Sequence, residues 1–190
     1  MPSTPEIFIS YAWGESREDI VEKLYNILLA KGYAVQRDKV NIGYKGNIKQ
    51  FMQQLGAGGA IVVVLSKKYL ESPYCMYEAL QIRENGDFER RIFPIVLADA
   101  NIFDPLVQLD YVSFWDQKIN ELQEKMRQAT SLTHIKPIQE ALDLYADIRR
   151  FIASFMDVIK NMNVLTPKMH LESDFSALLK NLDAIFPNQP

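Results

Sequence analysis

The fold of this chain is decided by one stretch, Ile61-Val62-Val63-Val64-Leu65-Ser66, together with the Ser72-Pro73 pair and Glu78 that follow it. Positions 61 to 65 are all apolar, which is typical of a central parallel strand because such a strand is buried on both faces. Ser72 and Pro73 are typical of a helix start, since serine caps the first turn and proline suits the first helical position. The stretch therefore predicts a buried strand and then a helix that ends near Asn85-Gly86.

Similar short apolar runs occur on both sides of this stretch, and helical stripes lie between them. Strands are predicted at 7–9, 33–36, 61–65 and 92–97, with a short edge strand at 110–114. Apolar residues at helical spacing predict two of the intervening helices at 20–28 and 48–55. Strands that alternate with helices indicate a parallel sheet covered on both sides. The sequence therefore predicts an α/β fold, a three-layer sandwich around a five-stranded parallel sheet that ends near residue 115.

The remainder of the chain has helical patterns without strands between them. A polar helix is predicted at 117–128, a long amphipathic helix spans 138–162, and a last helix carries apolar residues from 175 to 185. Consecutive helices of this kind indicate a flank or a small helical appendage, so the chemistry is expected in the first 115 residues.

The composition argues against several classes of protein. The chain has 190 residues, with 21 Lys and Arg against 24 Asp and Glu, which gives a formal net charge of −3. This balance argues against direct nucleic-acid binding, because phosphate contacts need a surplus of basic residues. The apolar run at 60–65 is too short to cross a membrane. The single cysteine, Cys75, cannot form an internal disulfide, so we expect a soluble, cytoplasmic protein.

Most kinds of site are poorly supported by the residue pattern. His134 and His170 lie far apart, and Cys75 has no sulfur partner, so no metal site is predicted. The glycines at 56–59 precede a strand, whereas a dinucleotide-binding loop follows one. The loop Gly43-Tyr44-Lys45-Gly46 lacks the ending of a phosphate-binding loop, but it follows a predicted strand, where open α/β sheets bind ligands.

The carboxylate of Glu78 is the main candidate for chemistry. Tyr74 lies four residues earlier, so the ring and the carboxylate are expected on one side of the helix. Cys75, Ala79 and Ile82 fall on the neighbouring face, which is expected to pack on the sheet. Spacing alone leaves two interpretations open: a functional carboxylate near the carboxyl ends of the strands, or a solvated helix glutamate.

Several stretches together resemble Toll/interleukin-1 receptor homology (TIR) domains, in particular the NAD-cleaving bacterial type. Ile7-Phe8-Ile9-Ser10-Tyr11 resembles their first box, and Arg37-Asp38 through Gly43 resembles the second box and the following BB loop. The stretch 61–78 follows the bacterial pattern of strand, serine, Tyr-Leu and Ser-x-Trp-Cys-x-x-Glu, and Phe114-Trp115 resembles the third box. The four matches are collinear over about residues 6 to 115.

The resemblance implies a flavodoxin-like fold and one of two functions. It implies a TIR domain over 1–162 and a C-terminal helical extension over 163–190. In the enzymatic branch, the glutamate at the position of Glu78 cleaves NAD+ between nicotinamide and ribose, giving linear or cyclic ADP-ribose without a further cofactor. The alternative is a non-enzymatic adaptor that signals through TIR–TIR contacts. A related fold with a catalytic glutamate, the nucleoside deoxyribosyltransferase type, is a third interpretation.

The resemblance also implies roles for individual residues. Tyr74 stands where the family usually has tryptophan, and its ring can stack on a base. Further substrate-binding residues are expected at Ser10, Tyr11 and Trp13 on the opposite rim, and at Asp38 and Lys45 beside the BB loop. The BB-loop residues expected to support assembly are Ile42, Gly43 and Tyr44.

Partners follow from the same resemblance. Bacterial relatives usually act in antiviral defence, where a sensing domain or subunit drives TIR domains together into an oligomer. The near-neutral charge indicates no surface for a charged polymer on this chain, so activation is expected from such a partner.

Overall fold

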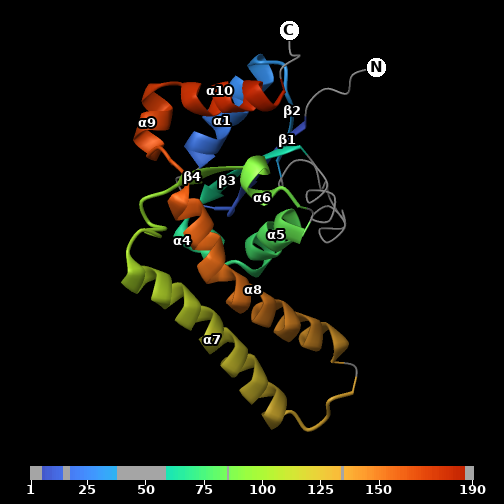
Figure 1. The fold of residues 1–190 in the computed structure, drawn as a ribbon. Helices are drawn as coiled ribbons and strands as arrows, with labels where there is room; N and C mark the ends of the chain where they lie inside the picture. Colours follow the sequence, from blue (N-terminus) through green and yellow to red (C-terminus); the bar gives the residue numbers. More distant parts are fainter. Residues whose placement is uncertain (1–5, 15–17, 38–58, 85, 134, 187–190) are drawn as a thin grey trace.

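The computed structural model describes residues 6–14, 18–37, 59–84, 86–133 and 135–186. A parallel sheet lies at its centre (Figure 1), and its strands are β1 (Glu6–Tyr11), β2 (Ala34–Arg37), β3 (Ala60–Leu65) and β4 (Ile92–Val96). The strand order is β2-β1-β3-β4, so the chain-central β3 lies between β1 and β4 as its fully apolar sequence predicts.

Helices follow or precede each of these strands. Their bounds are α1 (Glu18–Ala30), α4 (Lys67–Leu70), α5 (Pro73–Glu84), α6 (Phe88–Arg91), α7 (Pro105–Gln128), α8 (Lys136–Asn161), α9 (Pro167–Glu172) and α10 (Ser176–Ile185). The helix predicted after Ser72-Pro73 is confirmed as α5, and the Ser72 hydroxyl accepts a hydrogen bond from the backbone N–H of Cys75 at 3.3 Å.

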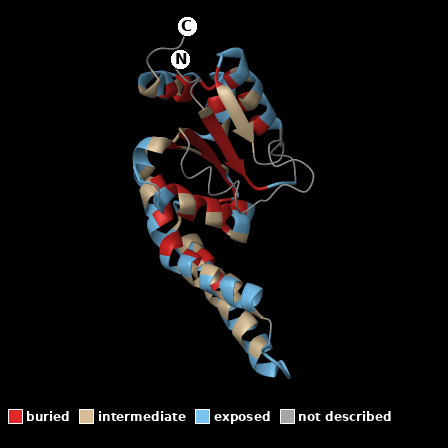
Figure 2. Cartoon of the chain, turned by 90° about the vertical axis from the view of Figure 1, so that its right-hand side faces the viewer, coloured by how far each residue is buried: buried red, intermediate tan, exposed pale blue. Residues whose placement is uncertain are grey.

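The alternation of side chains along each strand produces the three layers. Ile7, Ile9 and Tyr11 of β1 face α1 and α10, whereas Phe8 and Ala12 face α4, α5, α7 and α8. Strands β3 and β4 divide their residues in the same way, and the buried strands separate two helical layers (Figure 2). The predicted flavodoxin-like three-layer arrangement is confirmed.

The prediction of a fifth, edge strand at 110–114 is wrong, because the described residues contain four strands and these positions lie inside α7. The side chain of Asp104 accepts a hydrogen bond from the N–H of Leu106 at 2.9 Å, and Pro105 occupies the first turn. These residues start a helix, and Tyr111 and Trp115 are both buried because they lie one helical turn apart. The aromatic content that resembles a strand therefore belongs to a helix face.

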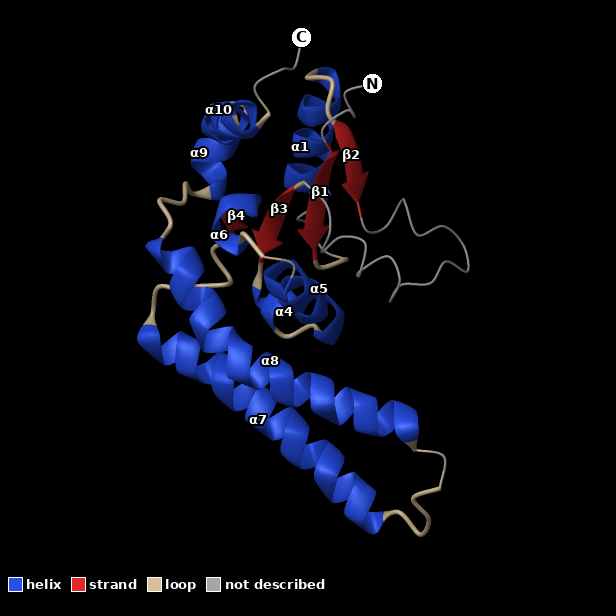
Figure 3. Ribbon diagram, turned by 45° about the vertical axis from the view of Figure 1, so that its right-hand side comes forward, coloured by secondary structure: helices blue, strands red, loops and turns tan. Residues whose placement is uncertain are grey.

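Helices α7 and α8 form a long antiparallel hairpin that extends away from the sheet (Figure 3). Near the sheet, α8 contributes Ile148, Ile152 and Phe155 to the core. Farther out the hairpin surface is mostly exposed. In the part of the chain that the structure describes, no helix is both long and apolar enough to cross a membrane.

The last helix, α10, covers the second face of the sheet beside α1. Its residues Leu178, Leu179 and Leu182 are buried, and the hydroxyl of Tyr33 donates a hydrogen bond to Asp183 at 2.5 Å. Burial and this hydrogen bond raise the pKa of Tyr33 well above its usual range, so the phenol stays protonated. The boundary between a domain at 1–162 and an extension at 163–190 stays a prediction.

We expect Leu182→Ala to destabilise the whole protein, because Leu182 of α10 is fully buried in the core that α10 forms with α1 and the sheet. The expected loss is about 2–5 kcal/mol in the free energy of unfolding, measured by chemical denaturation. The exposed Leu106 offers a matched control, and Leu106→Ala should change stability by less than about 0.5 kcal/mol. Equal effects of the two substitutions would contradict this packing.

The buried His170 should make the free energy of unfolding depend on pH. Its ring stacks on Phe175, is buried, and has no hydrogen-bond partner for either nitrogen among the described residues. Burial lowers the pKa of His170 below its ordinary value of 6.5, so the unfolded chain takes up a proton at a higher pH than the folded one. The free energy of unfolding should therefore fall as the pH drops below 6.5. His170→Leu should reduce this fall in denaturation curves, and parallel curves for the two proteins would contradict it.

Candidate active site

Three polar side chains from three different elements meet on the face of the sheet that packs against α4 and α5. Ser10 comes from β1, Tyr69 from α4 and Glu78 from α5. The Ser10 hydroxyl donates a short hydrogen bond to the Glu78 carboxylate, and its oxygen lies 2.9 Å from the hydroxyl oxygen of Tyr69. Glu78 and Ser10 are each 1% exposed, and Tyr69 is fully buried. We call Ser10, Tyr69 and Glu78 the hydroxyl–carboxylate cluster.

The local sequence explains how each group reaches this position. Ser10 follows Phe8 by two residues, so both side chains point to the same face of β1. The side chain of Ser66 caps α4 by accepting a hydrogen bond from the N–H of Tyr69 at 3.0 Å. Glu78 lies in the second turn of α5, whose buried residues Cys75 and Ala79 hold the helix against the sheet.

The position of the cluster agrees with the usual ligand-binding edge of open α/β sheets. Ser10 pairs with Val63 and Tyr11 with Val64, so the serine lies near the carboxyl ends of two adjacent parallel strands. Because Glu78 is buried, the alternative of a solvated helix glutamate is wrong. A carboxylate in this environment is stabilised by hydroxyl donors that replace water.

The other predicted substrate-binding residues lie in different environments. Tyr11 is buried on the opposite face of β1. Trp13 is 42% exposed and Tyr74 is 65% exposed, so both rings are accessible to solvent. The shared side of α5 that spacing predicts for Tyr74 and Glu78 is therefore divided between the surface and the interior.

Asp38 and Lys45, expected to contact substrate, and the BB-loop residues Ile42, Gly43 and Tyr44 lie outside the described residues.

The sequence predicts no role for Tyr69 of the cluster or for its neighbour Lys68. Tyr69 is recognisable only as part of the Tyr-Leu pair after β3. The ammonium nitrogen of Lys68 lies close to Gly14, since a Cβ added to Gly14 would lie 3.3 Å from that nitrogen. The positive φ of 80° at Gly14 allows the tight turn after β1. An ammonium group therefore lies against the turn that carries Trp13.

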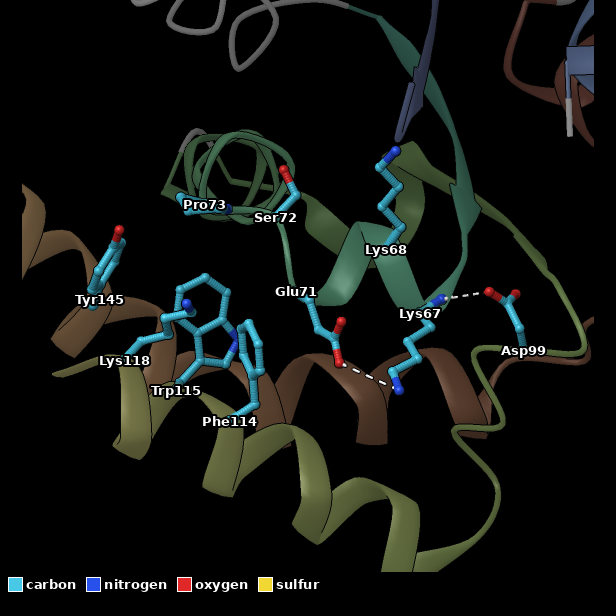
Figure 4. Close-up of a pocket in the computed structure, with 10 residues that line it drawn as sticks. All are labelled: Lys67, Lys68, Glu71, Ser72, Pro73, Asp99, Phe114, Trp115, Lys118 and Tyr145. Carbon is cyan, nitrogen blue, oxygen red and sulfur yellow. Dashed lines mark hydrogen bonds and ion pairs between the residues drawn. The ribbon is translucent and has the colours of Figure 1, made fainter. Parts of the chain in front are cut away.

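A surface pocket of about 630 Å³ lies at the amino end of α5, between α4, α7 and α8 (Figure 4). Lys67 forms an ion pair with Glu71 at 3.8 Å on one side of it, and Phe114, Lys118 and Tyr145 form the opposite side. Among the described residues, neither Glu78 nor any other residue for which the sequence predicts a role in binding lines this pocket. The pocket is therefore separate from the hydroxyl–carboxylate cluster.

The tryptophan of the third box has a structural role beside this pocket. Trp115 is fully buried and its indole N–H donates a hydrogen bond of 3.0 Å to the carbonyl of Leu70. This bond ties the end of α4 to α7 and so restrains the helix that carries Tyr69. Among the residues that the structure describes, no three His, Cys, Asp or Glu side chains gather closely enough to hold a metal ion.

The comparisons with known proteins agree with this fold. A family model described as "TIR domain" matches residues 7–129, which is most of the chain. The TIR domains in the structure of the activated Roq1 resistosome, which directly recognises the pathogen effector XopQ, superpose with a TM-score of 0.50. That match has 18% identity and covers 77% of this chain and 84% of the other, so it shows the shared fold. The sheet order, the collinear boxes and the family match lead to one conclusion: this chain belongs to the TIR domain family.

Proposed function

We propose that this TIR domain is an NAD+ glycohydrolase that releases nicotinamide and ADP-ribose, with Glu78 as the catalytic residue. The observation that carries the proposal is the buried Glu78 carboxylate, which accepts a hydrogen bond from Ser10 at the ligand-binding edge of the sheet. A carboxylate buried without a function would be costly, because its charge loses the solvation of water. A site of this kind is expected where a charge has a chemical role.

The chemistry requires one well-placed negative charge. The nicotinamide ring is positively charged in NAD+ and leaves as a neutral molecule when the bond to ribose C1′ breaks with both electrons. No general acid is needed for this leaving group. A developing oxocarbenium ion at C1′ is stabilised by the Glu78 carboxylate, and more strongly in a buried site than in water. Addition of water at C1′ and loss of a proton then give ADP-ribose, and attack by an adenine nitrogen gives the cyclic product.

Exposed groups around the cluster have the chemistry to bind the rest of the dinucleotide. The rings of Trp13 and Tyr74 are accessible for stacking on a base. The ammonium group of Lys68 lies beside the turn after β1 and suits a phosphate oxygen. We assign Asp38 and Lys45 to substrate binding as well, on the resemblance to the family. The predicted contact of Tyr11 with substrate is not part of the proposal, because its side chain is buried on the opposite face of β1 from Ser10. NAD+ enters as substrate, and no cofactor is part of the proposal.

We further propose that self-association activates the enzyme. The similar TIR domains of the Roq1 resistosome belong to a structure described as activated. Glu78 is almost inaccessible in the single chain, so a change at the site is needed before NAD+ reaches it. Contacts between TIR domains through Ile42, Gly43 and Tyr44 supply that change, driven by a sensing domain or subunit in cytoplasmic antiphage defence.

The second candidate function is a non-enzymatic adaptor that signals through TIR–TIR contact. The burial of Glu78 favours it, because a carboxylate that no substrate reaches has only a structural role. The two functions separate in signalling assays: an adaptor tolerates a change at Glu78 but not at Ile42 or Tyr44. The enzyme tolerates neither.

We expect Glu78→Gln to lower nicotinamide release from NAD+ at least about a hundredfold, because the neutral amide cannot stabilise the oxocarbenium ion. The assay uses concentrated protein under crowding conditions and follows nicotinamide by chromatography. Glu84→Gln on the same helix is the matched control, since Glu84 is exposed and its carboxylate accepts a hydrogen bond from the side chain of Gln81.

The control variant should keep wild-type turnover. No turnover by the assembled wild-type protein, or equal turnover by Glu78→Gln, would contradict the proposal. Release of base from nucleosides with NAD+ left intact would instead indicate a nucleoside deoxyribosyltransferase.

We expect specific activity to decrease on dilution, because activation requires contact between chains. Turnover per chain should rise with protein concentration and level off once the assembled form dominates, which light scattering on the same samples can follow. A specific activity that stays constant across a thousandfold dilution series would show that one chain is sufficient.

A further inference from the structure

We propose that Tyr69 and Ser10 form a directional hydroxyl chain that holds the Glu78 carboxylate in its reactive position. Both are then positioning residues for the reaction, and the inference rests on the proposed NAD+ cleavage. It assigns Tyr69 a role that its place in the sequence does not indicate. It also changes the expected role of Ser10 from a contact with substrate to a support of Glu78.

The direction of the chain follows from counting hydrogens. A serine hydroxyl has one hydrogen, and an ionised carboxylate can only accept. Ser10 therefore spends its hydrogen on Glu78. The oxygen of Ser10 can then only accept from Tyr69, whose hydroxyl oxygen lies 2.9 Å away. The phenol donates to the serine, and the serine donates to the carboxylate.

This order of donors strengthens the hydrogen bond that the Glu78 carboxylate accepts. Each hydroxyl in such a chain polarises the next, so the hydrogen bond from Ser10 is stronger because Tyr69 donates to it. With its hydrogen already committed, Ser10 has none left for a ribose oxygen. Its 1% exposure also keeps it away from solvent.

The phenol end of the chain is fixed by the surrounding structure. Tyr69 is fully buried, and its N–H is held by the side chain of Ser66. The next residue, Leu70, accepts the hydrogen bond from Trp115. Because α4 is held at both ends, the phenol stays at a fixed position relative to β1. The hydroxyl chain therefore connects Glu78 to a helix that is held at both ends.

The test begins with Tyr69→Phe, which keeps the ring and removes only the hydroxyl. We expect kcat for NAD+ cleavage to fall about tenfold, with KM changed less than about twofold, because the lost bond orients Glu78 and does not contact substrate. Ser10→Ala should lower kcat by about tenfold to a hundredfold in the same way. An increase in KM with kcat unchanged would indicate that these hydroxyls bind substrate, and would overturn the inference.

The matched control is Tyr111→Phe. Tyr111 is also buried, and its hydroxyl donates to the carbonyl of Ala100 at 2.8 Å, at a place not connected to Glu78. Both Phe variants lose a buried hydroxyl, but only Tyr69→Phe should lose kcat. Thermal unfolding of each variant shows which fraction is folded during the assay. Equal losses of kcat in the two variants would mean a general effect on stability and would overturn the inference.

A double-mutant cycle tests whether Tyr69 acts through Ser10. In the Ser10→Ala background, Tyr69→Phe should have almost no further effect on kcat, because the chain is already broken. Independent effects on kcat that multiply in the double variant would overturn the inference that the two hydroxyls act as one chain.

The same cycle measured on the unfolding equilibrium constant does not depend on activity, and should show coupling of at least about threefold. If wild-type protein does not cleave NAD+, the proposed function fails. The presence or absence of coupling between Tyr69 and Ser10 in unfolding still decides whether the hydroxyl chain exists.

Discussion

The burial of one carboxylate is the constraint on which the rest of this structure depends. Glu78 is taken out of water on the inner side of α5, and a carboxylate is tolerated there only if hydrogen-bond donors replace the solvent. Ser10 on β1 is one such donor, and its oxygen lies within hydrogen-bond distance of the Tyr69 hydroxyl on α4. Three elements must therefore keep their relative positions for the site to exist. The cap at Ser66 and the bond from Trp115 are understandable as parts of this requirement.

The same constraint connects the fold to the proposed chemistry. A carboxylate that accepts a hydrogen bond from a hydroxyl in a buried site can direct its negative charge at a bound substrate. Such a charge is suited to a cationic transition state, which is what departure of nicotinamide from ribose produces. The exposed rings of Trp13 and Tyr74 lie at the surface, which is the part of the protein that a substrate meets first. In the proposed function, the buried Glu78 acts on the ribose and the surface rings bind the substrate.

The sequence predicts those parts of the molecule that depend on local patterns. The apolar run at 61–65 and the Ser72-Pro73 pair are enough to place β3 and α5, and the motif around Glu78 is enough to select the carboxylate. The short pattern at 110–114 predicts an edge strand, but these residues lie in α7, because Asp104 and Pro105 start a helix that continues through them. The link between Ser10 and Tyr69 joins positions 59 residues apart, so no local pattern contains it. It depends on the register of β1 against β3, which only the assembled sheet determines.

The central claim is that Glu78 acts on the nicotinamide-bearing ribose. The most direct measurement is a crystal structure of the assembled protein with a carbocyclic NAD+ analogue that cannot be cleaved. We predict that a carboxylate oxygen of Glu78 lies within hydrogen-bond distance of that ribose analogue, with Ser10 still donating to the other side of the carboxylate. An analogue bound in the pocket between α4, α7 and α8, with Glu78 buried and out of contact, would contradict the claim.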